Sequence, residues 1–122
     1  MADRKEWQAH WREYNNGVLP PIISLLGDMN DIVAESYTRQ REWLFEQRPD
    51  GLSRGQKELL FAILDIFIDH AEGARQHINA ALDAGLPPIQ AREALTQVFM
   101  LRGMSSFAEI GHEIWEACQK RS

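Results

Sequence analysis

The fold is decided by two adjoining stretches, LLFAILDIFI at residues 59–68 and DHAEGARQHINAALDAGLPP at residues 69–88. The first is the most apolar run of the chain. The second contains His70 and His77, seven residues apart, and the small-residue breaks Gly73 and Gly85. An apolar helical run beside two titratable imidazoles predicts a buried helix next to the residues that carry chemistry.

Length and composition predict a globular protein with one core. The chain has 122 residues, of which 44% are hydrophobic and 25% are charged, so residues 1–122 are expected to form a single domain. Its one cysteine, Cys118, excludes an internal disulfide and a dithiol redox pair. We expect this thiol to be a small core residue or an incidental one.

Charge and hydropathy exclude several classes of partner. Thirteen basic residues against eighteen acidic ones give a net charge of −5, so nucleic acid is not an expected partner. The first residues, MADRKEWQAHWREY, are charged throughout and do not have the apolar region of a signal peptide. The longest apolar run is far shorter than the ~20 residues of a membrane span. A soluble, cytoplasmic protein is expected.

Glycine, proline and capping residues divide the chain into helices, and no strand alternation is seen. Pro49 and Asp50-Gly51 form a turn, and Ser53 with Gln56 has the spacing of a capping box. An all-α, single-domain bundle of about six helices is therefore predicted. The expected helices are 3–15, a short one from Pro20 and Pro21 to about Gly27, 28 or 30 to about 47, 53–69, 72–84, 88–101 and 104–119.

Two helices carry informative faces. Trp7, Trp11 and Tyr14 follow i, i+4, i+7 spacing, so we expect them to pack either on the same chain or on another subunit. Helix 53–69 is apolar nearly all round and is predicted to be the central, buried helix.

The acidic residues of this predicted central helix form one narrow stripe. Glu58, Asp65 and Asp69 lie at i, i+7 and i+11. For Asp65 and Asp69 the stripe indicates a thin solvated edge. The competing interpretation is that the helix turns its carboxylates into a cavity.

From about residue 52 to 117, the sequence resembles the carboxymuconolactone decarboxylase and alkylhydroperoxidase D-like family. The resemblance is carried by the apolar helix that begins at Glu58, by the H-x3-A-x3-G pattern of His77, Ala81 and Gly85, and by IQAREALTQVFMLRGMSSFAEI at residues 89–110. It implies an alkylhydroperoxidase D-like helical fold that assembles as a homo-oligomer, a trimer or a hexamer.

The peroxidase branch of that family uses a glutamate, a C-x-x-C pair and a histidine. By spacing, these positions fall on Glu58, His70, Gly73 and His77, so both thiols are absent. Reduction of a peroxide needs an attacking thiolate and a resolving thiol, which Cys118 alone does not supply. A peroxidase is therefore not expected.

The decarboxylase branch is the better precedent. It implies a lyase that acts on a small carboxylated lactone or ring compound by acid/base chemistry without a cofactor. Loss of CO2 leaves an enolate-like carbanion, which needs a proton donor and a polar contact for its oxygen. By resemblance His77 is the catalytic acid or base, while Glu58 and His70 orient it or bind substrate. Glu72 and Arg75 are weaker candidates for substrate binding.

Two other interpretations stay open. In a continuous helix His70 and His77 would stand about 10.5 Å apart along the axis, too far for one zinc ion. A break at 71–73 would allow a site of Glu58, His70 and His77, but no metal is expected. The other alternative is an inactive family member that serves as a binding or assembly subunit, with Glu58 and His77 buried in satisfied pairs or among apolar groups.

Overall fold

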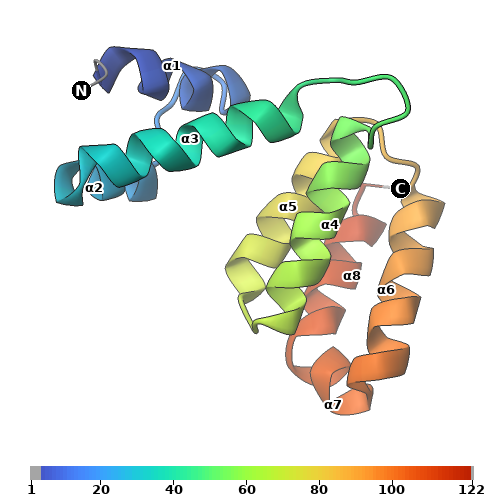
Figure 1. The fold of residues 1–122 in the computed structure, drawn as a ribbon. Coiled ribbons are helices and arrows are strands. Elements are labelled where there is room, and N and C mark those ends of the chain that lie inside the picture. The colour runs from blue at the N-terminus through green and yellow to red at the C-terminus, as the bar shows by residue number, and fades with distance from the viewer. Residues whose placement is uncertain (1–3, 122) are drawn as a thin grey trace. The chain divides into compact units, whose positions relative to one another are not determined.

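The computed structural model describes residues 4–121, and it is all-α as predicted, with no strand in that range. Contacts between Cα atoms divide the chain into two compact units, Met1–Glu46 (unit 1) and Gln47–Ser122 (unit 2). Figure 1 labels the helices of both units. The single domain expected for residues 1–122 stays a prediction.

Unit 1 consists of α1 (Arg4–Tyr14), α2 (Pro21–Met29) and α3 (Asp31–Phe45). Asn30 begins α3, because its side-chain oxygen accepts hydrogen bonds from the N–H groups of Ile32 and Val33. The predicted second helix continues two residues past Gly27. A Cβ at Gly27 would lie 2.9 Å from the Trp7 ring, so this position needs a glycine for close packing.

The tryptophan stripe of α1 packs within its own unit. Trp7 and Trp11 are buried, at 3% and 8% exposure. The Trp11 Nε1–H donates to Thr38 Oγ1 at 2.7 Å, and the Thr38 hydroxyl donates to the Ala34 carbonyl at the same distance. Of the two partners expected for these aromatics, the structure provides the one in the same chain.

His10 lies beside the same stripe, with its ring 4.8 Å from the Tyr14 ring and 5.6 Å from the Trp11 ring. Burial, followed by the positive charge of Arg41, lowers the pKa of His10 below its ordinary value. The charged form of this histidine is therefore disfavoured inside a packed aromatic cluster.

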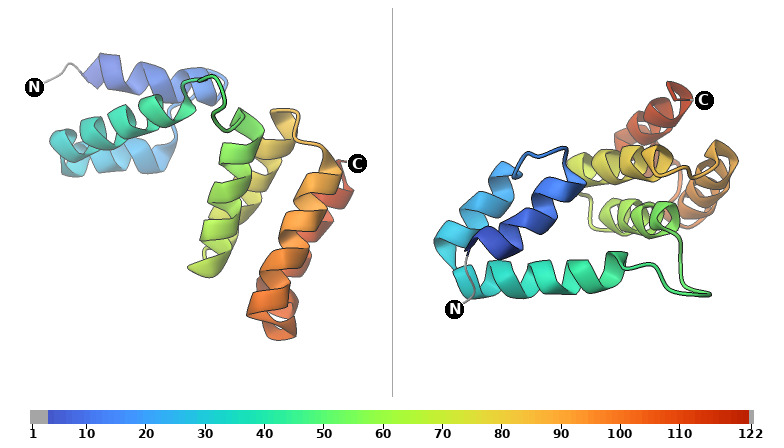
Figure 2. Two further views of the ribbon diagram at one scale, coloured as in Figure 1. Left: turned by 45° about the vertical axis from the view of Figure 1, so that its right-hand side comes forward. Right: turned by 90° about the horizontal axis from the view of Figure 1, so that it is seen from above.

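Unit 2 contains the remaining helices, which Figure 2 shows from two sides. It comprises α4 (Arg54–Phe67), α5 (Ala71–Asp83), α6 (Pro88–Arg102), α7 (Met104–Ser106), the π-helical segment η1 (Phe107–Gly111) and α8 (His112–Gln119). The last three follow one another over the predicted helix 104–119. The core of unit 2 is largely aliphatic. It includes Ala62, Ile66, Ala74, Ile78, Ala81, Leu95, Val98 and Ile114.

The α4–α5 hairpin is the centre of unit 2. The predicted capping box begins α4: the N–H of Gln56 donates to Ser53 Oγ at 3.1 Å, and the N–H of Ser53 donates to Gln56 Oε1 at 3.0 Å. At the far end, Asp69 takes a left-handed conformation with φ at +59°. A short polar side chain tolerates this conformation, and the chain reverses into α5 there.

The prediction that helix 53–69 is the central, buried helix holds for only one face of α4 in the single chain. Its inner face is buried at Glu58, Ala62 and Ile66. On another face large apolar side chains stay exposed, namely Leu60, Leu64, Phe67 and the following Ile68. An uninterrupted apolar sequence does not show which of its faces finds a partner within the chain.

The π-helical segment brings a glycine against an aromatic ring. A Cβ at Gly111 would lie 2.2 Å from the Phe99 ring, so only glycine lets α6 approach at this point. The Phe99 and Phe107 rings then meet edge to face, with centroids 5.4 Å apart.

None of the helices within residues 4–121 is both long and apolar enough to cross a membrane.

Candidate functional site

The α4–α5 hairpin brings together His77 and Glu58, two of the catalytic residues that the sequence predicted. His77, on α5, contacts Glu58, on α4, with 2.6 Å between His77 Nδ1 and Glu58 Oε2. The Glu58 side chain is 3% exposed and that of His77 is 26% exposed. Because a carboxylate accepts and does not donate, we assign the Nδ1–H tautomer to the neutral ring. The Nε2 edge is thereby left available.

The ring of His77 is also held by stacking. The Phe61 ring lies with its centroid 5.0 Å away at an interplanar angle of 29°. Phe61 is one turn beyond Glu58 on the same helix, so α4 supplies both a hydrogen-bond acceptor and an aromatic platform. Together they fix the position and the tilt of the imidazole.

Asp65 extends the pair into a chain of four titratable groups. Its Oδ2 lies 3.8 Å from His77 Nε2, and its Oδ1 lies 3.7 Å from His70 Nδ1. These separations are longer than a hydrogen bond, and they allow an ion pair with Asp65 when either imidazole is protonated. The order Glu58, His77, Asp65, His70 runs from a side chain 3% exposed to one 59% exposed. The four groups therefore extend from the buried pair to the surface.

Gly73 makes room for this chain of groups. A Cβ at this position would lie 2.3 Å from Asp65 Oδ2 and 2.6 Å from His70 Nδ1. The position that would hold the second thiol of a C-x-x-C pair therefore holds a residue without a side chain, and a carboxylate and an imidazole fill the space.

His70 is the N-terminal cap residue of α5, and its side chain makes no capping hydrogen bond there. Its N–H donates to the Asp65 carbonyl at 2.8 Å. The neighbouring Asp69 carboxylate receives Arg102 Nη2 at 2.7 Å, and Arg102 Nη1 donates to the Phe67 carbonyl at 3.1 Å. The turn that carries His70 is thus tied to α6.

The structure does not bring Arg75 and Glu72 to the Glu58–His77 pair. Arg75 forms ion pairs with Glu72 on its own helix and with Glu113 on α8, the latter at 3.5 Å. Glu72 also accepts a hydrogen bond from Gln76 at 3.2 Å. Arg75 therefore faces α8, whereas His77 faces α4. Substrate binding by Arg75 and Glu72 stays a prediction without a contact that supports it.

Cys118 is the single cysteine of the sequence, and its thiol is buried in α8. Burial raises its pKa above the ordinary value, which opposes formation of the thiolate. This environment is the reverse of the one that an attacking cysteine needs. Among the described residues, no group of three or more His, Cys, Asp or Glu side chains is arranged to hold a metal ion.

Sequence reasoning favoured a solvated edge for Asp65 over a cavity, and it did not consider Phe61 as part of the site. Asp65 is 17% exposed and faces the two histidines, so the cavity-like interpretation of the acidic stripe fits it better. Asp69, at 71% exposure, lies on the solvated edge. The signal for Asp65 was its spacing of seven residues from Glu58, because two helical turns return a side chain to the same face.

These features define an all-α protein with an oriented glutamate–histidine pair at a helical hairpin. The structure is similar to the crystal structure of a protein from Burkholderia xenovorans LB400 that is provisionally named a carboxymuconolactone decarboxylase. The TM-score is 0.79 at 24% sequence identity, over 95% of this chain and 88% of that one. The chain therefore has the carboxymuconolactone decarboxylase fold that the sequence predicted. No family profile matches the sequence, and no curated protein matches it significantly.

Replacing Gly73 with alanine tests how the four groups depend on the space at this position. We expect the Gly73→Ala variant to stay folded, because the added Cβ meets the ends of two side chains and alanine favours the helix by roughly 0.5–1 kcal/mol. The Asp65 carboxylate and the His70 ring should both move away. Ring ¹⁵N and ¹H shifts of His70 and His77 at fixed pH should therefore change, while urea unfolding stays within about 1 kcal/mol of wild type.

Ala80→Gly, on the same helix, is the control for altered helix propensity. It should change stability and leave the ring shifts of His70 and His77 as they are. Unchanged ring shifts in Gly73→Ala would contradict the role assigned to the glycine.

Proposed function

We propose that the chain is a lyase of the decarboxylase type, acting on a small carboxylated lactone or ring compound by acid/base chemistry without a cofactor. The observation that carries this proposal is the 2.6 Å contact between Glu58 and His77, with one edge of the imidazole left partly exposed. The fold shared with a protein provisionally named a carboxymuconolactone decarboxylase supports the same class of reaction.

In this reaction the bond from the ring carbon to the carboxylate breaks and CO2 leaves. The electron pair of the broken bond passes into the conjugated carbonyl group, which forms an enolate. The imidazolium form of His77 gives the proton on Nε2 to the carbon, and the Nδ1–H remains bonded to Glu58. Water then returns a proton to Nε2, along the side that faces Asp65 and His70. Glu58 keeps the ring in one orientation through the cycle.

The alternative of an inactive assembly subunit is not favoured. In that case Glu58 and His77 would both be buried. Here the carboxylate is buried and the His77 side chain keeps 26% of its surface exposed. A purely structural pair has no need of an imidazole edge open toward a second carboxylate.

We also propose that the chain works as a homo-oligomer, as the resemblance implies. The exposed apolar residues Leu60 and Leu64 flank Phe61 and Asp65 along α4. Apolar side chains of this size rarely stay exposed together unless they meet a partner. A second copy on this face would cover the apolar side chains that border the candidate site.

Loss of the imidazole should abolish the reaction. We expect His77→Gln to lower kcat/KM for CO2 release by about 10²–10⁴-fold, because it removes the group that transfers the proton. Glu58→Gln should lower it less, since the amide oxygen still accepts from Nδ1–H. The assay is CO2 release from carboxymuconolactone and other carboxylated lactones.

The matched control is His112→Gln, on α8, where His112 lies 3.7 Å from Glu116 and is 42% exposed. This variant should keep the wild-type rate. Equal rates for His77→Gln and wild type, or no CO2 from any lactone of the series, would exclude the proposed reaction.

The assembly is tested by a charge on the exposed face of α4. By light scattering after size exclusion, wild type should have a mass that is a multiple of 14.0 kDa. Leu64→Asp should shift it toward the monomer, because burying an unpaired carboxylate weakens each contact by about 100-fold or more.

Val18→Asp is the matched control for this assembly test, since Val18 is 58% exposed and Leu64 is 59% exposed. It should leave the mass unchanged. A wild-type mass of one chain, or an assembly that survives Leu64→Asp intact, would refute the proposed homo-oligomer.

A further inference from the structure

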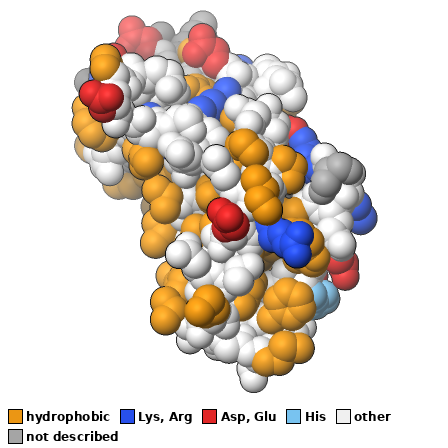
Figure 3. Space-filling view, turned by 90° about the vertical axis from the view of Figure 1, so that its right-hand side faces the viewer, with side chains coloured by type: hydrophobic (Ala, Val, Ile, Leu, Met, Phe, Trp, Pro, Cys, Tyr) orange, Lys and Arg blue, Asp and Glu red, His pale blue; other side chains and the backbone are white. Residues whose placement is uncertain are grey.

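Unit 2 has a cavity that lies away from the Glu58–His77 pair. It is a hollow of about 460 Å³ between α6, η1 and α8, within the range of about 300–1,000 Å³ of small-molecule sites. Figure 3 shows the face that carries α6, where hydrophobic side chains gather with basic ones among them. The lining residues are Arg92, Leu95, Thr96, Phe99, Met100, Phe107 and Trp115. Neither Glu58 nor His77 is among them.

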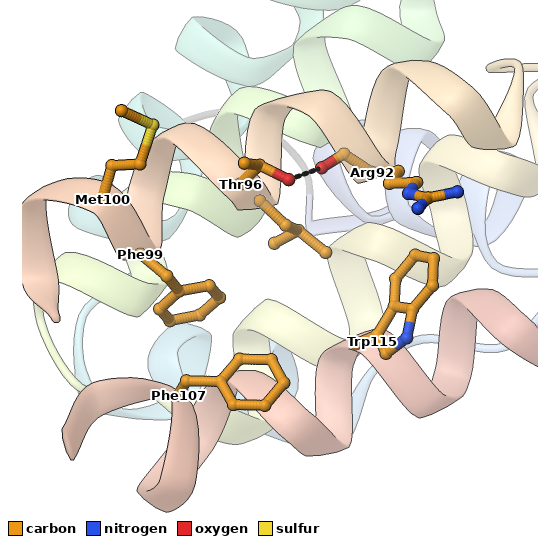
Figure 4. Close-up of a pocket in the computed structure, with 7 residues that line it drawn as sticks. Arg92, Thr96, Phe99, Met100, Phe107 and Trp115 are labelled. Carbon is orange, nitrogen blue, oxygen red and sulfur yellow. Dashed lines mark hydrogen bonds between the residues drawn. The ribbon is translucent and has the colours of Figure 1, made fainter. Parts of the chain in front are cut away.

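The walls of this cavity are aromatic. Figure 4 shows the rings of Phe99, Phe107 and Trp115 directed into the space between the helices. The first two rings meet edge to face, with centroids 5.4 Å apart, which leaves ring faces available to a third ring. All three side chains are partly buried and partly open to the cavity. A flat, apolar ring is the kind of group that such walls bind.

The cavity has one charged side chain. Arg92 lies beside Trp115, with its guanidinium carbon 6.0 Å from the ring centroid. Within the part of the chain that the structure describes, Arg92 forms no ion pair, whereas Arg75, Arg102 and Arg121 each have a carboxylate partner. In a chain of net charge −5, an arginine left without a carboxylate at an apolar cavity is positioned for an anion from outside.

The surrounding polar groups limit the charge of that anion. The Thr96 hydroxyl donates to the Arg92 carbonyl at 2.7 Å, so its proton is already used within the helix. Glu93 lines an adjoining hollow of about 340 Å³ that shares Arg92 and Thr96. Its nearby negative charge disfavours a second anionic group on the ligand.

We propose that this cavity, defined by Arg92, Phe99, Phe107 and Trp115, binds a small aromatic monocarboxylate. The ring lies among the three aromatic side chains, and the carboxylate pairs with the Arg92 guanidinium. This binding site is separate from the Glu58–His77 pair, and it does not depend on the reaction proposed for that pair.

The proposal is tested by titrating the full chain with 2-naphthoate, followed by ¹H–¹⁵N NMR and calorimetry. We expect saturable shifts confined to α6, η1 and α8, including the Trp115 indole N–H. Arg92→Gln should weaken binding about tenfold or more, because it removes a charge-assisted pair. The neutral amide 2-naphthamide should bind wild type and Arg92→Gln equally, within about twofold.

Two matched variants distinguish this cavity from a general attraction to arginine and from the Glu58–His77 pair. Arg39→Gln removes an exposed arginine of unit 1 and should bind 2-naphthoate as wild type does. His77→Gln should do so as well, because His77 does not line the cavity. Loss of binding in His77→Gln would place the probe at the Glu58–His77 pair and overturn the proposal.

Other results would overturn it too. The first is a lack of saturation by 2-naphthoate up to ~10 mM, a concentration high enough to detect sites with a Kd above ~1 mM. The second is equal affinity of Arg92→Gln and wild type for 2-naphthoate. A third is concentration-dependent shifts of Phe99, Phe107 and Trp115 without any probe, which would show that a second copy of the chain fills the cavity.

Discussion

The hydrogen bond between His77 and Glu58 is the contact on which the α4–α5 hairpin depends. A carboxylate with a 3% exposed side chain is costly to bury unless polar groups satisfy it, and His77 Nδ1 lies 2.6 Å from it. The bond joins residues that are 19 positions apart, so it fixes the register of α5 against α4. The buried side chains of Ala62, Ile66, Ala74 and Ile78 pack in the core of the same hairpin.

The surrounding residues make this contact useful beyond its contribution to stability. Phe61 stacks on the imidazole, and Gly73 leaves the space that Asp65 and His70 occupy. Arg102 holds the turn at Asp69 from the neighbouring helix. The imidazole is thus oriented by the Glu58 hydrogen bond and the Phe61 ring, while its Nε2 edge stays partly exposed. The cavity at Arg92 is lined by residues of α6, η1 and α8, none of which belongs to the α4–α5 hairpin.

Most of the helices could be predicted because their signals are local. The capping box at Ser53 and Gln56, the turn at Asp50 and Gly51, and the glycine break at Gly103 each act within a few residues. The exposed face of α4 and the orientation of Asp65 could not be predicted in this way. Both depend on which neighbour packs on which face, and a helical pattern gives the spacing of a stripe without its partner. The cavity beside Arg92 could not be predicted for the same reason, because Arg92, Phe107 and Trp115 come from separate helical segments.

The most direct test of the account is the tautomer of His77, read from its ring ¹⁵N shifts at a pH high enough for the ring to be neutral. With Glu58 at 2.6 Å from Nδ1 and Asp65 at 3.8 Å from Nε2, the account predicts that Nδ1 carries the proton. In a folded Glu58→Leu variant this preference should be lost. A wild-type ring protonated at Nε2, or a tautomer that ignores the substitution, would contradict the central role given to the Glu58–His77 bond.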